Sequence, residues 1–296
     1  MLEKWKGELA TLVATLFWGS SFVAIKAGLD HIEPIPFVVL RFLFASAFFT
    51  IIYFTYKKSF KISLLRNKYV YMMALFNAGG FLFQYIGLDH TSAIKGALLI
   101  NINVVFVMLI AHFYLGEAVT RKKLVSVIGG LVGIFLLISE GDVGLLLSGS
   151  VKGDLIVLLG GTCWAFYIAL SRKVVKDGAC IFELNYMLVL LTSLLLLPFL
   201  WGTDVHLTSE NMLFIVYVAF FCTVVTFLLW TYGLKTVSAT ASSVILMNEI
   251  VFATILGIIL LGESLNAIGF LGALVMMFSI ANISLERRGK SLLRKS

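Results

Sequence analysis

The chain has 296 residues, of which 60% are hydrophobic and only 13% are charged. Soluble domains carry about 25% charged residues, and a chain with so few could not cover its own surface with polar groups. This composition excludes a soluble enzyme, a disordered chain and a nucleic-acid-binding module, and it predicts a polytopic membrane protein. The net charge of +7 comes from Lys and Arg in short loops, where these residues act as topology signals.

Ten apolar stretches follow one another along the chain, and each is long enough to cross a hydrocarbon core about 30 Å thick as a helix. They cover residues 8–28, 35–56, 69–88, 95–115, 122–140, 153–172, 181–200, 211–233, 240–261 and 266–284. The runs are continuous rather than alternating, so we expect an all-α protein without strands. The three prolines, Pro34, Pro36 and Pro198, lie near the ends of stretches, and each helix is therefore expected to be uninterrupted.

Most of the Lys and Arg residues fall on one side of the predicted bundle when the N-terminus is placed in the cytoplasm, whereas Lys95 and Lys152 fall outside. The positive-inside rule therefore predicts that both termini are cytoplasmic. The basic tail after Arg287 is expected to contact anionic lipid. The first stretch is too long for the apolar core of a cleavable signal, so we expect it to be the first membrane helix of a cell-membrane protein.

The chain repeats itself at a spacing of 146 residues. Trp18 recurs as Trp164, and Leu115-Gly116-Glu117 recurs as Leu261-Gly262-Glu263, after which the register is expected to slip by a few residues. Each copy holds five stretches, an odd number, so the second copy must cross the membrane in the opposite direction. We therefore predict two inverted five-helix repeats, residues 1–146 and 147–296, an arrangement typical of secondary transporters.

Several motifs along the chain carry a resemblance to a known family. They are Phe17-Trp18-Gly19 and Cys163-Trp164, Arg41 after Pro36, and the paired Gly116-Glu117 and Gly262-Glu263. In these features the chain resembles the drug/metabolite transporter superfamily, in its ten-helix EamA-like permease branch. The resemblance implies a 5+5 inverted-repeat bundle in the cytoplasmic membrane, with the fifth and tenth helices peripheral. It also implies export or exchange of small metabolites, often amino acids or related compounds.

Two ionisable residues lie within predicted membrane helices, where a charge needs a function or a partner. Glu249 stands near mid-depth of the ninth stretch, at a position where members of the family often have proline, as they do at Asn103. It is either a proton-coupling site or ligand for a substrate ammonium, or a structural carboxyl bonded to Asn248 or to a neighbouring helix. Arg41 either binds a substrate carboxylate through its bidentate fork or makes a structural pair.

Polar and aromatic residues at matched positions are the candidates for a cavity lining. Asn77, Gly80 and Gln84 share one face of the third stretch, and their counterparts in the eighth are Thr223, Thr226 and Trp230. The predicted lining comprises Trp18, Ser21, Arg41, Asn77, Gln84, Asn101, Trp164, Tyr167, Thr223, Thr226 and Trp230. Asn101 and Asn103 are two residues apart on a helix, so only one of them is expected to face the pore. The alternative for all these residues is packing or hydrogen bonding between helices.

Glu117 and Glu263 end helices near opposite membrane surfaces. Each carboxylate can accept backbone N–H bonds at the start of the following helix, and we expect a structural role for both. The cysteines and histidines have no metal-ligand spacing, and neither a metal nor another cofactor is expected.

Together these observations predict a secondary transporter that moves a small polar or amphipathic solute by alternating access, driven by the solute gradient or by protons. No G-x-x-x-x-G-K-[ST] pattern is present, so ATP is not the expected driver. Three alternatives stay open: a multidrug or lipid-like cargo exporter, a lipid-modifying enzyme that uses Asp30-His31 or Asp89-His90, and a passive channel. The predicted partners are the solute and membrane lipids. One chain holds both repeats, so a monomer suffices, and Gly129-x-x-x-Gly133 leaves a homodimer open.

Overall fold

The structure, a computed structural model, describes all residues except 1–4, 30–31, 57–65, 89, 92, 145–149, 206, 263 and 294–296. The first half contains α1 (Lys6–Gly28), α2 (Pro34–Tyr56), α3 (Lys68–Leu88), α4 (Ala93–Asn101), α5 (Asn103–Leu115) and α6 (Arg121–Ser139). The second contains α7 (Val151–Lys176), α8 (Ile181–Leu196), η4 (Leu197–Leu200), α9 (Ser209–Ala219), η5 (Phe220–Val225), α10 (Thr226–Gly233), α11 (Ala239–Leu246), α12 (Glu249–Leu261) and α13 (Ala267–Leu293). No strand occurs in the described residues, as predicted.

Nine helical segments within the described residues are long and apolar enough to cross a membrane. They correspond to the predicted stretches except the third. The helix α3 has 21 residues but is less apolar, because it carries Asn77 and Gln84. Large apolar side chains are exposed on the outside of the bundle, among them Phe54 (77%) and Phe113 (82%). Lipid must cover such a surface, so the chain is a multi-pass membrane protein.

Several helix boundaries in the last part of each half follow one spacing. The helices α5 and α12 both end at a glycine in the left-handed conformation, with φ of 67° at Gly116 and 68° at Gly262, where a side chain would be strained. The next helices start at Arg121 and at Ala267, again 146 residues apart. The predicted slip of register after Glu263 is therefore wrong.

Two of the predicted helices are interrupted near their middle, contrary to the expectation from the prolines. Ile102 separates α4 from α5, and Met247 and Asn248 separate α11 from α12. Side-chain amides explain these breaks without proline, because an amide can take a carbonyl from the helical ladder. The Nδ2 of Asn101 donates to the Ala97 carbonyl at 2.9 Å, and that of Asn248 donates to the Val244 carbonyl at 3.4 Å.

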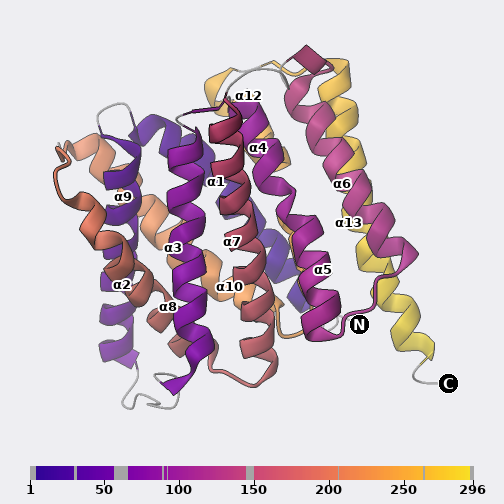
Figure 1. The fold of residues 1–296 in the computed structure, drawn as a ribbon, viewed down its shortest axis with the longest axis horizontal. Helices are drawn as coiled ribbons and strands as arrows, with labels where there is room; N and C mark the ends of the chain where they lie inside the picture. Colours follow the sequence, from indigo (N-terminus) through magenta and orange to yellow (C-terminus); the bar gives the residue numbers. More distant parts are fainter. Residues whose placement is uncertain are drawn as a thin grey trace.

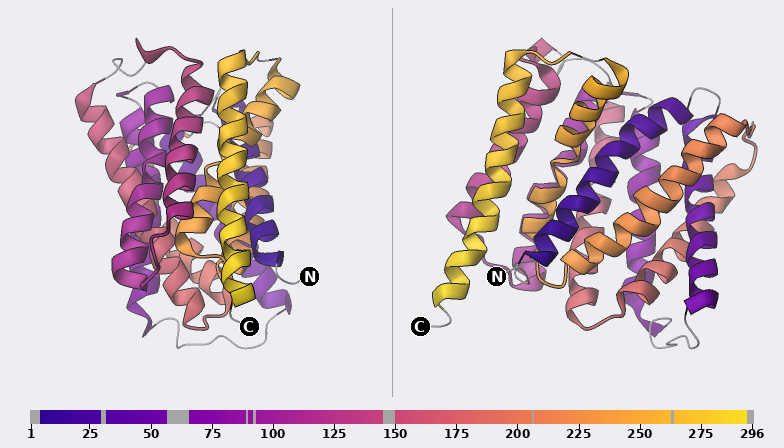
Figure 2. Two further views of the ribbon diagram at one scale, coloured as in Figure 1. Left: turned by 90° about the vertical axis from the view of Figure 1, so that its right-hand side faces the viewer. Right: turned by 180° about the vertical axis from the view of Figure 1, so that it is seen from behind.

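The helices run alternately between two ends of the bundle (Figure 1). The helix α1 begins and α13 ends at the same end, which we call the terminal end; the opposite one is the far end (Figure 2). In the centre, α1 packs against α9, α10 and α12, and α7 packs against α3, α4 and α5.

At one side of the bundle, α6 and α13 pack along each other (Figures 1 and 2). Glycines allow their close approach, since a β-carbon on Gly272 would lie 2.6 Å from the Gly133 carbonyl oxygen. This pair comprises the fifth and tenth predicted helices. It contributes no residue to the cavity described below.

Candidate functional site

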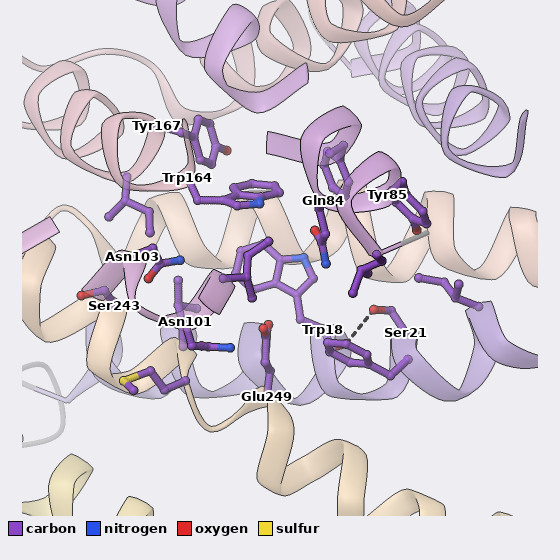
Figure 3. A pocket seen from close by; sticks show the side chains of 18 of the residues that line it. Trp18, Ser21, Gln84, Tyr85, Asn101, Asn103, Trp164, Tyr167, Ser243 and Glu249 are labelled. Carbon is purple, nitrogen blue, oxygen red and sulfur yellow. Dashed lines mark hydrogen bonds between the residues drawn. The ribbon is translucent and has the colours of Figure 1, made fainter. Parts of the chain in front are cut away.

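A cavity of about 420 Å³ lies in the middle of the bundle, within the size range of small-molecule sites. Residues of α1, α2, α3, α4, α5, α7, α10, α11 and α12 line it, so both halves of the chain contribute. It extends to the far ends of α1 and α3, where Lys26, Leu29 and Leu88 border it. Figure 3 shows polar and aromatic side chains converging on this space.

The structure brings many of the predicted lining residues together at this cavity. They are Trp18, Ser21, Arg41, Gln84, Asn101, Trp164, Tyr167 and Trp230, together with Glu249. They come from seven different helices, and the repeat spacing had linked Trp18 to Trp164 and Gln84 to Trp230. The pairing of equivalent positions around one space is what two related halves produce when they face each other.

Three predicted lining residues lie away from the cavity. Asn77 is completely buried and donates from Nδ2 to the Thr192 hydroxyl of α8 at 3.1 Å. It stands seven residues before Gln84, about 10 Å nearer the terminal end along α3, at a depth that α8 covers.

Thr223 and Thr226 are displaced for a different reason, which is the π-helical turn η5. Their hydroxyls donate to carbonyls five residues earlier, those of Val218 (3.0 Å) and Phe221 (2.7 Å). The wider turn changes the faces that regular helical spacing predicts.

Asn101 and Asn103 both line the cavity, so the expectation that only one could do so is wrong. It assumed a continuous helix, whereas the chain is interrupted at Ile102 between them. Sequence reasoning also missed Tyr85 and Ser243. The repeat could have indicated Asn103, because its counterpart 146 residues later is Glu249.

A layer of aromatic rings forms the floor of the cavity on the terminal side. The ring centroids of Trp18 and Trp230 are 5.9 Å apart, those of Tyr167 and Trp230 are 5.3 Å apart, and those of Trp164 and Tyr167 are 5.7 Å apart. The indole Nε1 of Trp230 donates to the Ser242 hydroxyl of α11 at 2.8 Å, which satisfies its only buried polar group.

Beyond this floor, α1 and α10 are in direct backbone contact at the terminal end, and their counterparts α7 and α3 make a similar contact at the far end, where a β-carbon on Gly87 would lie 3.1 Å from the Gly153 carbonyl oxygen. A β-carbon on Gly233 of α10 would lie 2.8 Å from the carbonyl oxygen of Gly7 in α1. Only glycine permits this approach without displacing backbone. Nearby, Nη1 of Arg172 at the end of α7 donates to the Leu234 carbonyl that follows α10.

Glu117 adds a polar connection at the same end, between α5 and α11. Its Oε1 accepts from the Ala239 N–H at 2.8 Å, and its Oε2 accepts from the Thr240 hydroxyl at 3.2 Å and from Lys123 Nζ at 3.1 Å. Burial opposes ionisation of this carboxyl, but the Lys123 ammonium and the backbone N–H donors outweigh it, so the pKa of Glu117 lies below its usual range. The carboxylate thus binds the first turn of α11 in the other half, whereas the expected partner was the helix that follows it, α6, whose first turn is capped by Thr120 instead. The matching Glu263 lies outside the described residues.

Glu249 is the first residue of α12, directly after the interruption at Met247 and Asn248. Its carboxyl group points into the cavity between Asn101 and Trp18 (Figure 3). No hydrogen bond or ion pair to this carboxyl occurs among the described residues, so the hydrogen bond to Asn248 considered above is not made. The position is held by close packing: a β-carbon on Gly19 of α1 would lie 2.7 Å from the Glu249 carbonyl oxygen.

Arg41 also borders the cavity, but it is only 3% exposed. Its Nε donates to the Thr223 hydroxyl at 2.8 Å and its Nη2 to the Cys222 carbonyl at 3.0 Å. The guanidinium carbon lies 5.1 Å from the centre of the Phe81 ring, a cation–π distance. Arg41 thus connects α2 to the π-helical turn of the second half.

The lipid-modifying enzyme considered in the sequence analysis would use Asp30-His31 or Asp89-His90. Three of these four residues, Asp30, His31 and Asp89, lie outside the described residues. In the part of the chain that the structure describes, no three His, Cys, Asp or Glu side chains form a cluster that could hold a metal ion.

Comparison with known proteins defines the class of this molecule. The sequence profile of the EamA-like transporter family matches the chain twice, over residues 5–139 and 151–285. The uncharacterized transporter YyaM of Bacillus subtilis (strain 168) is 27% identical over 278 residues, which cover 91% of this chain and 90% of that protein. A Salmonella typhimurium protein named as a probable amino-acid metabolite efflux pump is 26% identical over 286 residues, 92% of each chain. A crystal structure with 18% sequence identity has the same fold, with a TM-score of 0.79 over 95% of this chain and 97% of that chain.

A bundle of membrane helices that encloses a small-molecule cavity, in a chain whose relatives are named as transporters, defines a membrane transport protein. The chain belongs to the EamA-like transporter family, within the drug/metabolite transporter superfamily.

Proposed function

We propose that this protein is a secondary transporter of the cell membrane that exports or exchanges a small metabolite, an amino acid or a related amine-bearing compound, by alternating access. The observation that carries the proposal is the cavity itself. It lies at the centre of the bundle, is bordered on the terminal side by a layer of aromatic rings and contains a carboxyl group without a partner among the described residues. Such a space can hold a solute during transfer between the two sides of a membrane.

The membrane topology that we propose has ten spans, which are the nine apolar segments described above and, in addition, α3. It consists of two inverted five-helix repeats, residues 1–146 and 147–296, with both termini in the cytoplasm. Three observations support it: the double match to the family at a spacing of 146 residues, the same spacing of several helix boundaries, and the concentration of Lys and Arg at one end. The terminal end is then cytoplasmic, and the cavity extends outward.

Alternating access is supported by an asymmetry between the two ends. At the terminal end α11 packs against α5, whereas their counterparts α4 and α12 have no comparable contact among the described residues. Arg172 at the terminal end donates to the Leu234 carbonyl. The residues that correspond to them in the first half, Lys26 for Arg172 and Leu88 for Leu234, border the cavity instead. In an inverted repeat, exchanging the two arrangements would close the outer end and open the inner one.

The test is transport by the purified protein in liposomes. We expect saturable counterflow of labelled amino acids, accelerated by an imposed pH gradient if Glu249 also carries protons. Glu249→Gln should abolish the pH response, and Glu210→Gln, at the exposed start of α9, should preserve it. Folded protein that moves neither amino acids nor related amines would contradict the proposal.

A second candidate, an exporter of amphipathic drugs or lipid-like cargo, is favoured by one observation. Much of the cavity wall is aromatic, with Trp18, Phe81, Trp164, Tyr167 and Trp230 in the lining. Counterflow of bulky apolar cations, with no counterflow of amino acids, would select this candidate.

A further inference from the structure

The acidic and basic groups around the cavity differ in how accessible they are to a solute, and this difference determines which chemical group of the solute the protein can bind. The inference below rests on the proposed transport function. It concerns Glu249 in the wall, Arg41 behind the wall, and Lys26 at the outer mouth. Which of them a solute meets determines which of its own groups is recognised.

The carboxyl group of Glu249 is directly available to a solute. It is aimed into the cavity at the start of a half-helix, where the aligned N–H groups of α12 favour negative charge. It has no cationic or hydrogen-bonding partner among the described residues. A carboxylate in such a place gains most from a cation that the solute brings with it.

The aromatic groups next to Glu249 suit the same cation. Figure 3 places the Trp18 indole beside the carboxyl group and Trp164 across the cavity. The negative face of an indole ring attracts an ammonium group, and this attraction strengthens when water is excluded. The Asn101 amide lies on the other side of Glu249.

Arg41, in contrast, is already engaged by the protein. Its Nε and Nη2 donate to Thr223 and Cys222, which engages two of the five N–H donors of the guanidinium. The Cys222 carbonyl is available because it lies in the π-helical turn, where the regular ladder of hydrogen bonds is interrupted. Phe42 and Phe81 lie 5.8 Å and 5.1 Å from its guanidinium carbon. With these contacts and only 3% exposure, Arg41 is held by the protein more firmly than Glu249, which has no such partner among the described residues.

Lys26 is the remaining cation of the lining. It stands eight residues after Trp18, about 12 Å farther along α1 toward the outer mouth. A compact solute whose amine lies at Glu249 therefore leaves Lys26 beyond its reach.

We propose that the cavity selects its solutes by a protonated amine, bound between Glu249 and Trp18, and that a carboxylate on the solute is not required. The substrate class is then compounds that carry a protonated primary amine on an apolar body. It includes amino acids, and it extends to the amines that remain when their carboxyl group is removed.

Matched compounds test this without altering the protein. Two sets are used: phenylalanine, phenethylamine and 3-phenylpropionate, and leucine, isoamylamine and 4-methylpentanoate. The first of each set has both charged groups, the second only the amine and the third only the carboxylate. Counterflow in proteoliposomes and competition between compounds are measured at one pH. We expect the amines to be transported with an apparent affinity within about tenfold of the amino acids, and the acids to be neither transported nor competitive.

Two variants locate the selectivity. Glu249→Gln should weaken amine competition roughly 10–100-fold, the range expected for losing a hydrogen bond to a charged group. Arg41→Lys retains the charge but not the geometry of the Thr223 and Cys222 contacts, and should leave the ratio of amine to amino acid affinity unchanged. If Arg41→Lys does not fold, the comparison of the six compounds with the wild-type protein decides alone.

The outcomes separate this inference from the proposed function. Transport of the amino acids without the amines would overturn amine selection while leaving an amino-acid carrier. Transport of the acids with rejection of the amines would also overturn it. If neither amino acids nor amines move through folded protein, the inference and the proposed function both fall.

Discussion

The Oε1 of Glu117 accepts a hydrogen bond of 2.8 Å from the backbone N–H of Ala239, and this bond joins the end of α5 to the start of α11. The two helices belong to different halves of the chain, and their contact lies at the terminal end of the bundle. The same carboxylate binds Lys123 and the Thr240 hydroxyl. Its removal should therefore affect both stability and the closure of this end.

Glu117→Gln should open the terminal end more often, because an amide replaces a charged acceptor that holds α11. The readout is the labelling of Ser243→Cys, in the cavity wall, by a membrane-impermeant thiol reagent added to inside-out vesicles, with the three native cysteines replaced by alanine. We expect faster labelling than with Glu117 intact. Unchanged labelling would show that the glycine contact of α1 and α10 closes this end by itself.

The stability contributed by Glu117 should depend on pH in one direction. Its folded-state pKa lies below the unfolded value of about 4.3, so the ionised form stabilises the folded protein. This contribution is complete above about pH 5 and is lost as the pH falls through the folded-state pKa. Thermal unfolding in detergent should show Glu117→Gln to be less stable by about 1–3 kcal/mol at pH 7, with the difference shrinking in acid. A difference that grows in acid would contradict the assignment.

Gly233→Ala should destabilise the closed terminal end. Its β-carbon would lie 2.8 Å from the Gly7 carbonyl oxygen, and backbone cannot move aside as a side chain can, so α1 and α10 must separate at a cost of about 1–3 kcal/mol. Gly79→Ala is the matched control, because its β-carbon would meet only side-chain atoms, with the Cys163 sulfur nearest at 3.3 Å. Thermal unfolding of the two variants should differ. Equal stability would show that the helices adjust without loss.

A carboxylate moved to the equivalent place in the other half should retain part of the amine binding. Asn103 and Glu249 both line the cavity, both start half-helices and are 146 residues apart. We expect Glu249→Asn to abolish amine competition and the double variant Asn103→Glu/Glu249→Asn to restore it in part. Competition by phenethylamine in proteoliposomes measures both. No recovery, with folded protein, would mean that the surroundings of Glu249 are specific to the second half.

The positions of the helices along the chain could be predicted because a helix that crosses a lipid bilayer needs a long run of apolar residues, and such runs can be identified in a single sequence. The third stretch shows the limit of this signal, since Asn77 and Gln84 lower its hydropathy. Equivalence between the halves linked Trp18 to Trp164 and Gln84 to Trp230 as candidates for one lining, and all four border the cavity, because related positions face a common space.

Local departures from the regular helix could not be predicted. The break at Ile102 turned both Asn101 and Asn103 toward the cavity, and the π-helical turn removed Thr223 from it. These depend on competition between side-chain and backbone hydrogen bonds, which differ by little free energy and are settled by the neighbouring helices. The engagement of Arg41 follows from the same turn.

The interruptions at Ile102 and at Met247 and Asn248 have a mechanical consequence. At these places the backbone is held by short-range bonds, such as Asn248 N–H to the Ile245 carbonyl at 3.2 Å and Ile250 N–H to the Met247 carbonyl at 3.4 Å. A membrane helix that is already interrupted at mid-length can bend there without breaking further backbone hydrogen bonds. Each of these two spans then behaves as two short helices, and one of them can change its orientation while the other stays packed in the bundle.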